Sequence, residues 1–112
     1  MKIAISIMAP ESNASLDPRF GRAPAFAVVD TESGQPKVLL NPAQHAAGGA
    51  GVQAAELMVK QGVKAVISGA FGPKAFNVLR AANIEMYQAQ SGTVGELIAK
   101  FQHGDLRIVE GS

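Results

Sequence analysis

The chain has 112 residues, no cysteine, and ten Lys and Arg against nine Asp and Glu, which leaves a net charge of +1. A length below the usual ~150 residues per domain predicts one domain spanning residues 1–112. The lack of cysteine excludes disulfides, thiolate nucleophiles and cysteine-ligated metal centres. The balanced charge gives no support for binding nucleic acid or a membrane surface. No stretch approaches the ~20 apolar residues of a membrane span, and the N-terminus lacks the features of a signal peptide, so we expect a cytoplasmic protein.

The first forty residues predict three strands. Isoleucines alternate with small residues over 3–7, which indicates a central strand covered on both faces. Residues 9–24 contain three prolines and read as a long loop. Two further apolar runs, 26–30 and 36–40, are joined by a short turn and predict an antiparallel hairpin.

The rest of the chain alternates helices and strands. An amphipathic helix is expected over about 51–61, ended by Gly62, and strands over 63–67 and 84–87. Pro73 suits the first turn of a second helix, and Thr93 with Glu96 forms a capping box that begins a third. This order predicts an α/β fold: a mixed five-stranded sheet whose second strand is antiparallel, with helices on both faces. Residues 105–112 predict either an extra short element or a fraying end.

Three small-residue turns precede the predicted helices. They are Gly48-Gly49-Ala50-Gly51, Ser68-Gly69-Ala70-Phe71-Gly72-Pro73 and Ser91-Gly92-Thr93. If the preceding strands are parallel, the three helix N-termini open on one edge of the sheet, where unpaired N–H groups favour an anion. The turns match neither a Walker A loop nor a dinucleotide fingerprint. The alternative is that the glycines only permit tight turns and close helix packing. The cradle candidates are Gly48, Gly49, Gly51, Gly69, Gly72, Ser91 and Thr93.

Two arginines lie in the first loop, which leaves the same sheet edge. Arg19 and Arg22 could hold carboxylate or phosphate oxygens of a ligand, and a salt bridge from Asp17 to an arginine could instead only order the loop. Phe20 and Phe26 are expected in the core.

His45 stands just before the first glycine-rich turn, outside any apolar pattern. A loop histidine there could bind a metal or transfer protons, although an isolated exposed histidine is more often without a function. Met8, at the end of the first strand, is expected in the core. A metal-dependent nuclease is poorly supported, because the first strand carries no acidic residue.

Four segments together resemble the dinitrogenase iron-molybdenum cofactor biosynthesis family, the small NifX/NafY-like accessory proteins. They are residues 19–26, 48–55, 68–79 and 92–96. The resemblance implies a ribonuclease H-like three-layer fold and a non-catalytic role, in which the protein holds or carries an iron–sulfur or iron-molybdenum cofactor or its precursor.

The resemblance also implies cofactor-assembly proteins as partners. Ligation in such proteins is expected from Cys or His, which leaves His45 as the candidate metal ligand. The alternative function is a metal-free module that binds a small anionic metabolite or a protein partner. The oligomeric state does not follow from the sequence.

Overall fold

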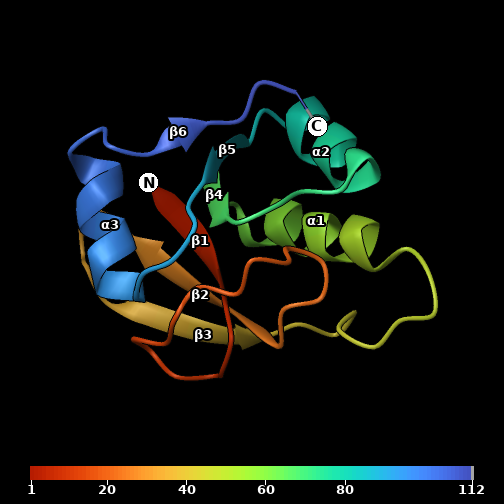
Figure 1. Cartoon of the computed structure of the whole chain (residues 1–112), viewed down its shortest axis with the longest axis horizontal. Helices are drawn as coiled ribbons and strands as arrows, with labels where there is room; N and C mark the ends of the chain where they lie inside the picture. The colour runs from red at the N-terminus through yellow and green to blue at the C-terminus, as the bar shows by residue number, and fades with distance from the viewer. Residues whose placement is uncertain (112) are drawn as a thin grey trace.

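Six strands form one mixed sheet in the order β3-β2-β1-β4-β5-β6 (Figure 1). The computed structural model describes residues 1–111. The elements in chain order are β1 (Lys2–Ile7), β2 (Ala25–Asp30), β3 (Pro36–Leu40), α1 (Ala50–Gln61), β4 (Ala65–Ser68), α2 (Pro73–Ala81), β5 (Glu85–Gln88), α3 (Val94–Gln102) and β6 (Arg107–Ile108). No helix among these residues is long and apolar enough to cross a membrane.

The strand directions put four strand ends at one edge. β1 pairs parallel with β4, and β4 with β5, whereas β2 pairs antiparallel with both β1 and β3. The expected reversal of the second strand is confirmed. The carboxyl ends of β1, β3, β4 and β5 therefore share one edge of the sheet, which we call the carboxyl edge.

The expectation of five strands is wrong. β6 is a two-residue strand in which Ile108 pairs antiparallel with Tyr87 and Arg107 pairs with Gln88. Both of its residues are exposed, so no alternation of apolar and polar residues marks it in the sequence. β6 lies within residues 105–112, for which the sequence predicts either a short extra element or a fraying end.

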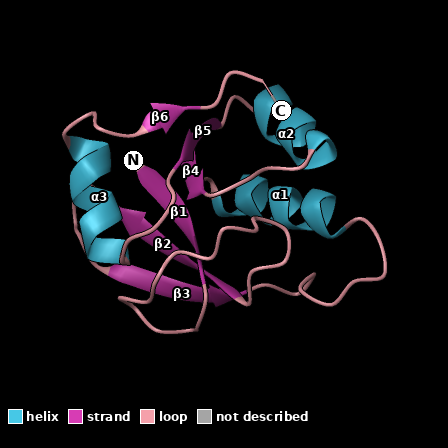
Figure 2. Cartoon of the chain, in the orientation of Figure 1, coloured by secondary structure: helices cyan, strands magenta, loops and turns pink. Residues whose placement is uncertain are grey.

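Helices cover both faces of the sheet, as predicted (Figure 2). α1 and α2 pack on one face in a cluster that includes Met58, Leu79 and both Phe20 and Phe26. α3 packs on the other face, where Leu97 joins the isoleucines of β1. The two phenylalanines are buried, as expected. Met8 is not in the core, because it follows the last residue of β1 and is 58% exposed.

Local sequence signals set the helix ends. Gly62 ends α1 in the left-handed conformation, with φ of 72°. The N–H of Val63 then bonds to Met58 O, which is why the next strand begins at Ala65 and not at the predicted position 63. Thr93 and Glu96 form the predicted capping box of α3.

The long loop between β1 and β2 is tied to the sheet by buried polar groups. The Ser6 hydroxyl donates to Asp17 O at 2.7 Å and lies 2.8 Å from the Ser68 hydroxyl oxygen. The backbone N–H of Asp17 donates to Ser6 O at 2.8 Å. Ser6, Ser68 and Asp17 are buried, and these bonds hold the loop beside the ends of β1 and β4.

We predict that Ser6→Ala destabilises the fold more than Ser68→Ala. The first change leaves the buried Asp17 carbonyl without its side-chain donor, which costs about 1–3 kcal/mol. The second leaves that bond in place. Urea denaturation of the two variants measures the difference, and equal losses of unfolding free energy would contradict this role for Ser6.

The capping box predicts a pH dependence. The Glu96 carboxylate accepts the Thr93 N–H at 2.9 Å and the Thr93 hydroxyl at 3.2 Å, and these bonds lower the pKa of Glu96 below its ordinary value of 4.5. Because the pKa is lower in the folded state, the stabilisation is present above the unfolded value and is lost as the pH falls through the folded one. Thermal unfolding between about pH 6 and pH 3 should therefore show a steeper loss of stability in the wild type than in Glu96→Gln.

The exposed residue Glu56, in the middle of α1, provides a matched control. Glu56→Gln should keep the wild-type slope. Identical slopes in the wild type and Glu96→Gln would show that the capping box does not depend on the charge of Glu96.

Candidate functional site

α1 and α2 begin side by side at the carboxyl edge, where the β1–β2 loop meets both. A groove of about 360 Å³ lies between the two helix starts and this loop, and we call it the α1–α2 groove. Its lining consists of Gly21, Arg22, Gly49, Ala50, Gly51, Val52, Gly72, Pro73, Lys74 and Ala75.

Two glycines permit the three segments to converge. A Cβ atom on Gly21 would lie 2.8 Å from the Cα of Gly51, which is too close for any larger residue. A Cβ atom on Gly51 would lie 3.2 Å from the Cβ of Ala75 in α2. The loop at Gly21 and the first turns of α1 and α2 therefore pack closely together at the base of the groove, which only glycine at positions 21 and 51 readily permits.

The first turns of α1 and α2 have unpaired donors. Gln53 is the first residue of α1 to donate inside the helix, to Gly49 O at 2.9 Å, and Phe76 is the first in α2, to Gly72 O at 2.9 Å. The N-cap residues of both helices are glycines, and no side chain of residues 1–111 caps either helix. The N–H groups that precede Gln53 and Phe76 are thus available to an anion at the positive end of each helix dipole.

Two cations and no carboxylate line the groove. Lys74 lies in the first turn of α2, where a positive charge is unfavourable unless an anion is near. The guanidinium of Arg22 donates to Gln44 O at 3.2 Å and to Ala46 O at 2.6 Å. It thereby holds the carbonyl groups on either side of His45, an exposed residue that does not itself line the groove.

α3 begins differently. Its Thr93 and Glu96 cap each other, and the Gly95 N–H donates to Asn13 Oδ1 at 2.9 Å. The Val94 N–H donates to Ala14 O at 3.1 Å. The first N–H groups of α3 are therefore already bonded within the protein, and the helix lies on the other face of the sheet from α1 and α2.

Arg19 has a partner inside the loop. Its Nε and Nη2 donate to the two carboxylate oxygens of Asp17 at 3.2 and 3.1 Å, and its backbone N–H donates to Asp17 Oδ1 at 2.9 Å. Hydrogen bonding to Asp17 raises the pKa of Arg19. The expected Asp17–arginine salt bridge is confirmed, and it orders the loop beside Ala70, whose carbonyl accepts the Phe20 N–H.

The structure brings some of the sequence-predicted residues together and separates others. Arg22, Gly49, Gly51 and Gly72 line the α1–α2 groove, with Gly48 next to it in the chain. Gly69 lies at the end of β4, where a Cβ atom would come 2.7 Å from the Cα of Pro18. The pair Ser91 and Thr93 lies at the start of α3, outside the groove.

Gly21 and Lys74 also line the groove, although neither was among the cradle residues predicted from the sequence. A lysine in the first turn of a helix, directly after an N1 proline, opposes the helix dipole and was a usable signal for an anionic ligand. Gly21 lies in one of the four segments that carry the family resemblance, but its contact with Gly51 joins positions far apart in the chain, and no local pattern encodes it.

Among residues 1–111 no group of three or more His, Cys, Asp or Glu side chains converges as a metal site.

Comparison with known proteins gives consistent matches over almost the whole chain. The family described as dinitrogenase iron-molybdenum cofactor matches residues 1–104. An uncharacterized protein of Methanocaldococcus jannaschii is 35% identical over 113 residues, which cover 98% of this chain and 92% of that protein.

Two solved structures are similar in fold and sequence. The apo form of the orange protein of Desulfovibrio gigas has a TM-score of 0.93 and 35% identity, over 98% of this chain and 93% of that one. A Thermotoga protein of the DUF35 family has a TM-score of 0.83 and 34% identity, over 96% and 91% of the two chains.

The family match contains every residue that lines the α1–α2 groove and ends before β6. The four sequence segments that carry the resemblance lie within it. The chain belongs to the dinitrogenase iron-molybdenum cofactor family.

Proposed function

We propose that this protein is a non-catalytic carrier of an anionic, metal-containing cofactor of the iron–sulfur or iron-molybdenum type, or of a precursor, bound in the α1–α2 groove. The observation that carries the proposal is the pair of uncapped helix N-termini that face one groove together with Arg22 and Lys74. The family's name supports this class of cargo. Cofactor-assembly proteins are the proposed partners, and a ribonuclease H-like classification is the proposed description of the fold.

The residues present suit an anion more than a ligated metal. With no cysteine in the chain, thiolate ligation is excluded. Sulfide or oxide atoms of a preformed cluster can instead accept hydrogen bonds from the first turns of α1 and α2. Arg22 and Lys74 would offset the negative charge, and His45 would supply one ligand or hydrogen bond. The proposed site at the carboxyl edge also has more distant members, which are Gly48, Gly69, Arg19, Ser91 and Thr93.

One relative, the orange protein, supports the proposal that the bound group can be removed from the protein. The structure of the orange protein is that of an apo form, and its name describes a coloured protein. A carrier that holds its cargo without thiolate bonds would likewise release it without breaking a covalent bond to the protein.

The second candidate is a metal-free carrier of a small phosphorylated or carboxylated metabolite. The lack of converging metal ligands among residues 1–111 favours it. It uses the same groove and the same donors, since phosphate and carboxylate oxygens also accept N–H bonds at helix N-termini. Metal analysis of the freshly purified protein separates the two, because only the first predicts bound iron or molybdenum.

We predict that Arg22→Gln and Lys74→Gln each weaken binding of a thiolate-ligated 4Fe–4S cluster anion. Each change removes one charge-assisted contact at the groove, with an expected loss of about tenfold in affinity. Anaerobic titration followed by visible absorption measures the dissociation constant.

Lys60→Gln is the matched control, because Lys60 is an exposed lysine in the last turn of α1, at the end away from the groove. It should bind the cluster like the wild type. Equal weakening by all three changes would indicate a general charge effect and would contradict the groove assignment. Repeating the series with inorganic phosphate tests the metal-free alternative.

We also predict that His45→Ala changes the visible spectrum of the bound cluster while His103→Ala does not. An imidazole in contact with the cluster alters its electronic transitions, whereas His103 caps the C-terminal end of α3 on the other face of the sheet. Spectra of both variants at saturating cluster provide the measurement. If both spectra match the wild type, His45 is not a ligand.

A further inference from the structure

A second hollow lies at the carboxyl edge, between the ends of β4 and β5. The chain leaves β4 toward α2 on one face of the sheet and leaves β5 toward α3 on the other. Adjacent parallel strands whose connections diverge in this way leave a crevice beyond their carboxyl ends, which is a common place for ligands in α/β proteins. Here the crevice has a volume of about 420 Å³.

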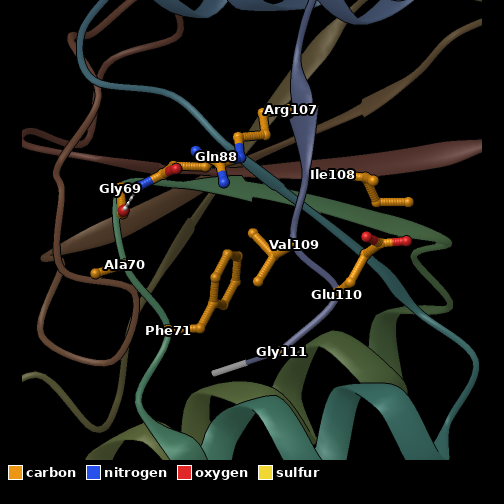
Figure 3. Close-up of a pocket in the computed structure, with 9 residues that line it drawn as sticks. All are labelled: Gly69, Ala70, Phe71, Gln88, Arg107, Ile108, Val109, Glu110 and Gly111. Atoms are coloured by element: carbon orange, nitrogen blue, oxygen red, sulfur yellow. Dashed lines mark hydrogen bonds between the residues drawn. The ribbon is translucent and has the colours of Figure 1, made fainter.

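The C-terminal segment forms one wall of this crevice (Figure 3). We call residues 105–111 the C-terminal strap. The opposite wall is the backbone after β4, with the side chain of Phe71, and Gln88 at the end of β5 lies between the walls. The lining residues are Gly69, Ala70, Phe71, Gln88, Arg107, Ile108, Val109, Glu110 and Gly111.

Two hydrogen bonds beyond β6 fix the strap over the edge of the sheet. The Val109 N–H donates to Met86 O at 2.8 Å, and the Arg80 guanidinium donates to Glu110 O at 2.7 Å. The extended backbone makes successive side chains alternate. In Figure 3, Val109 points toward Phe71, whereas Ile108 and Glu110 point to the opposite side of the strap.

The crevice has one apolar end and one cationic end. Val109 and Phe71 supply the apolar end. The ring of Phe71 packs against that of Phe20, with ring centroids 5.2 Å apart. Gln88 and Arg107 supply the polar end, where they are cross-strand neighbours. One Nε2 hydrogen of Gln88 donates to Gly69 O at 3.2 Å, which leaves the other free.

Among the described residues, the cation at this end has no acidic partner. Within residues 1–111, Arg107 takes part in no salt bridge, and its side chain is exposed. An arginine fork beside a free amide N–H matches the geometry of a carboxylate, which accepts two or more hydrogen bonds in one plane.

We propose that this crevice is a second binding site, for a small organic carboxylate with an apolar body. The carboxylate would lie against Arg107 and the free N–H of Gln88, and the apolar body between Phe71 and Val109. The site shares no lining residue with the α1–α2 groove. Its strap wall lies beyond residues 1–104, the part of the chain that the family match covers.

The test uses the full chain, labelled with ¹⁵N, and titration with 3-phenylpropanoate followed by amide chemical shifts. The expected result is saturable shifts at residues 69–71 and 107–111. The neutral analogue 3-phenylpropanamide should bind about tenfold more weakly, because it lacks the charge that pairs with arginine.

Two variants separate the ends of the site. Arg107→Gln should lower the affinity for the acid about tenfold and leave that for the amide unchanged. Val109→Ser should weaken acid and amide equally. Both residues lie on the strap outside the helices, and unchanged shifts elsewhere would show that each variant is folded. Lys60→Gln, at the end of α1 away from the α1–α2 groove, should bind the acid like the wild type. Shifts at residues 69–71 and 107–111 report this crevice, whereas shifts at Gly51 and Val52 report the α1–α2 groove, so a failure here is distinguishable from a failure of the carrier function.

Absence of shifts at the crevice, or equal affinity of the wild type for acid and amide, would overturn the proposal. A tripeptide that ends in phenylalanine with a free carboxylate tests the source of the ligand. Binding of this peptide more tightly than the free acid would support the carboxylate chemistry and identify a peptide C-terminus as its source. Weaker binding would support a small metabolite.

Discussion

The β1–β2 loop is attached to the carboxyl edge by buried hydrogen bonds, and it carries Gly21 and Arg22 to the α1–α2 groove. Buried hydrogen bonds between Ser6 and Asp17 hold the loop at the ends of β1 and β4. From there the chain passes so close to α1 that only glycine fits at position 21. Arg22 follows at once and holds the carbonyl groups on either side of His45. The hydrogen bonds of Ser6 and Asp17 thus help to position Gly21 and Arg22, two residues that line the α1–α2 groove.

The three helix starts at this edge differ in a way that composition alone does not suggest. α3 satisfies its own first turn with the capping box of Thr93 and Glu96, which leaves few of its first N–H groups for a ligand. α1 and α2 begin at glycines, without such a cap among residues 1–111. Lys74 then adds a cation where the dipole disfavours one, a local cost that a bound anion would offset. The first turn of α3 is therefore capped within the protein, whereas the first turns of α1 and α2 keep N–H groups to which an anion could bind.

Much of the fold could be predicted from the sequence because its signals are local. The capping box, Pro73 at a helix start and Gly62 at a helix end each act within a few residues. β6 could not be predicted in this way, because two exposed residues carry no periodicity and their pairing depends on the nearby edge of β5. Met8 was misplaced for a similar reason: its exposure follows from where β1 ends. At the site, glycine-rich turns identified the edge, but which turns share a groove depends on tertiary contacts such as Gly21 with Gly51.

In the proposed function the first turns of α1 and α2 together bind an anion. Titration of the ¹⁵N-labelled protein with molybdate, a diamagnetic oxyanion, followed by amide chemical shifts, tests this binding. We expect the largest saturable shifts at Gly51, Val52, Lys74 and Ala75, and unchanged shifts at Gly95 and Glu96 in the capped first turn of α3. Saturable shifts centred on α3, or none at either α1 or α2, would contradict it.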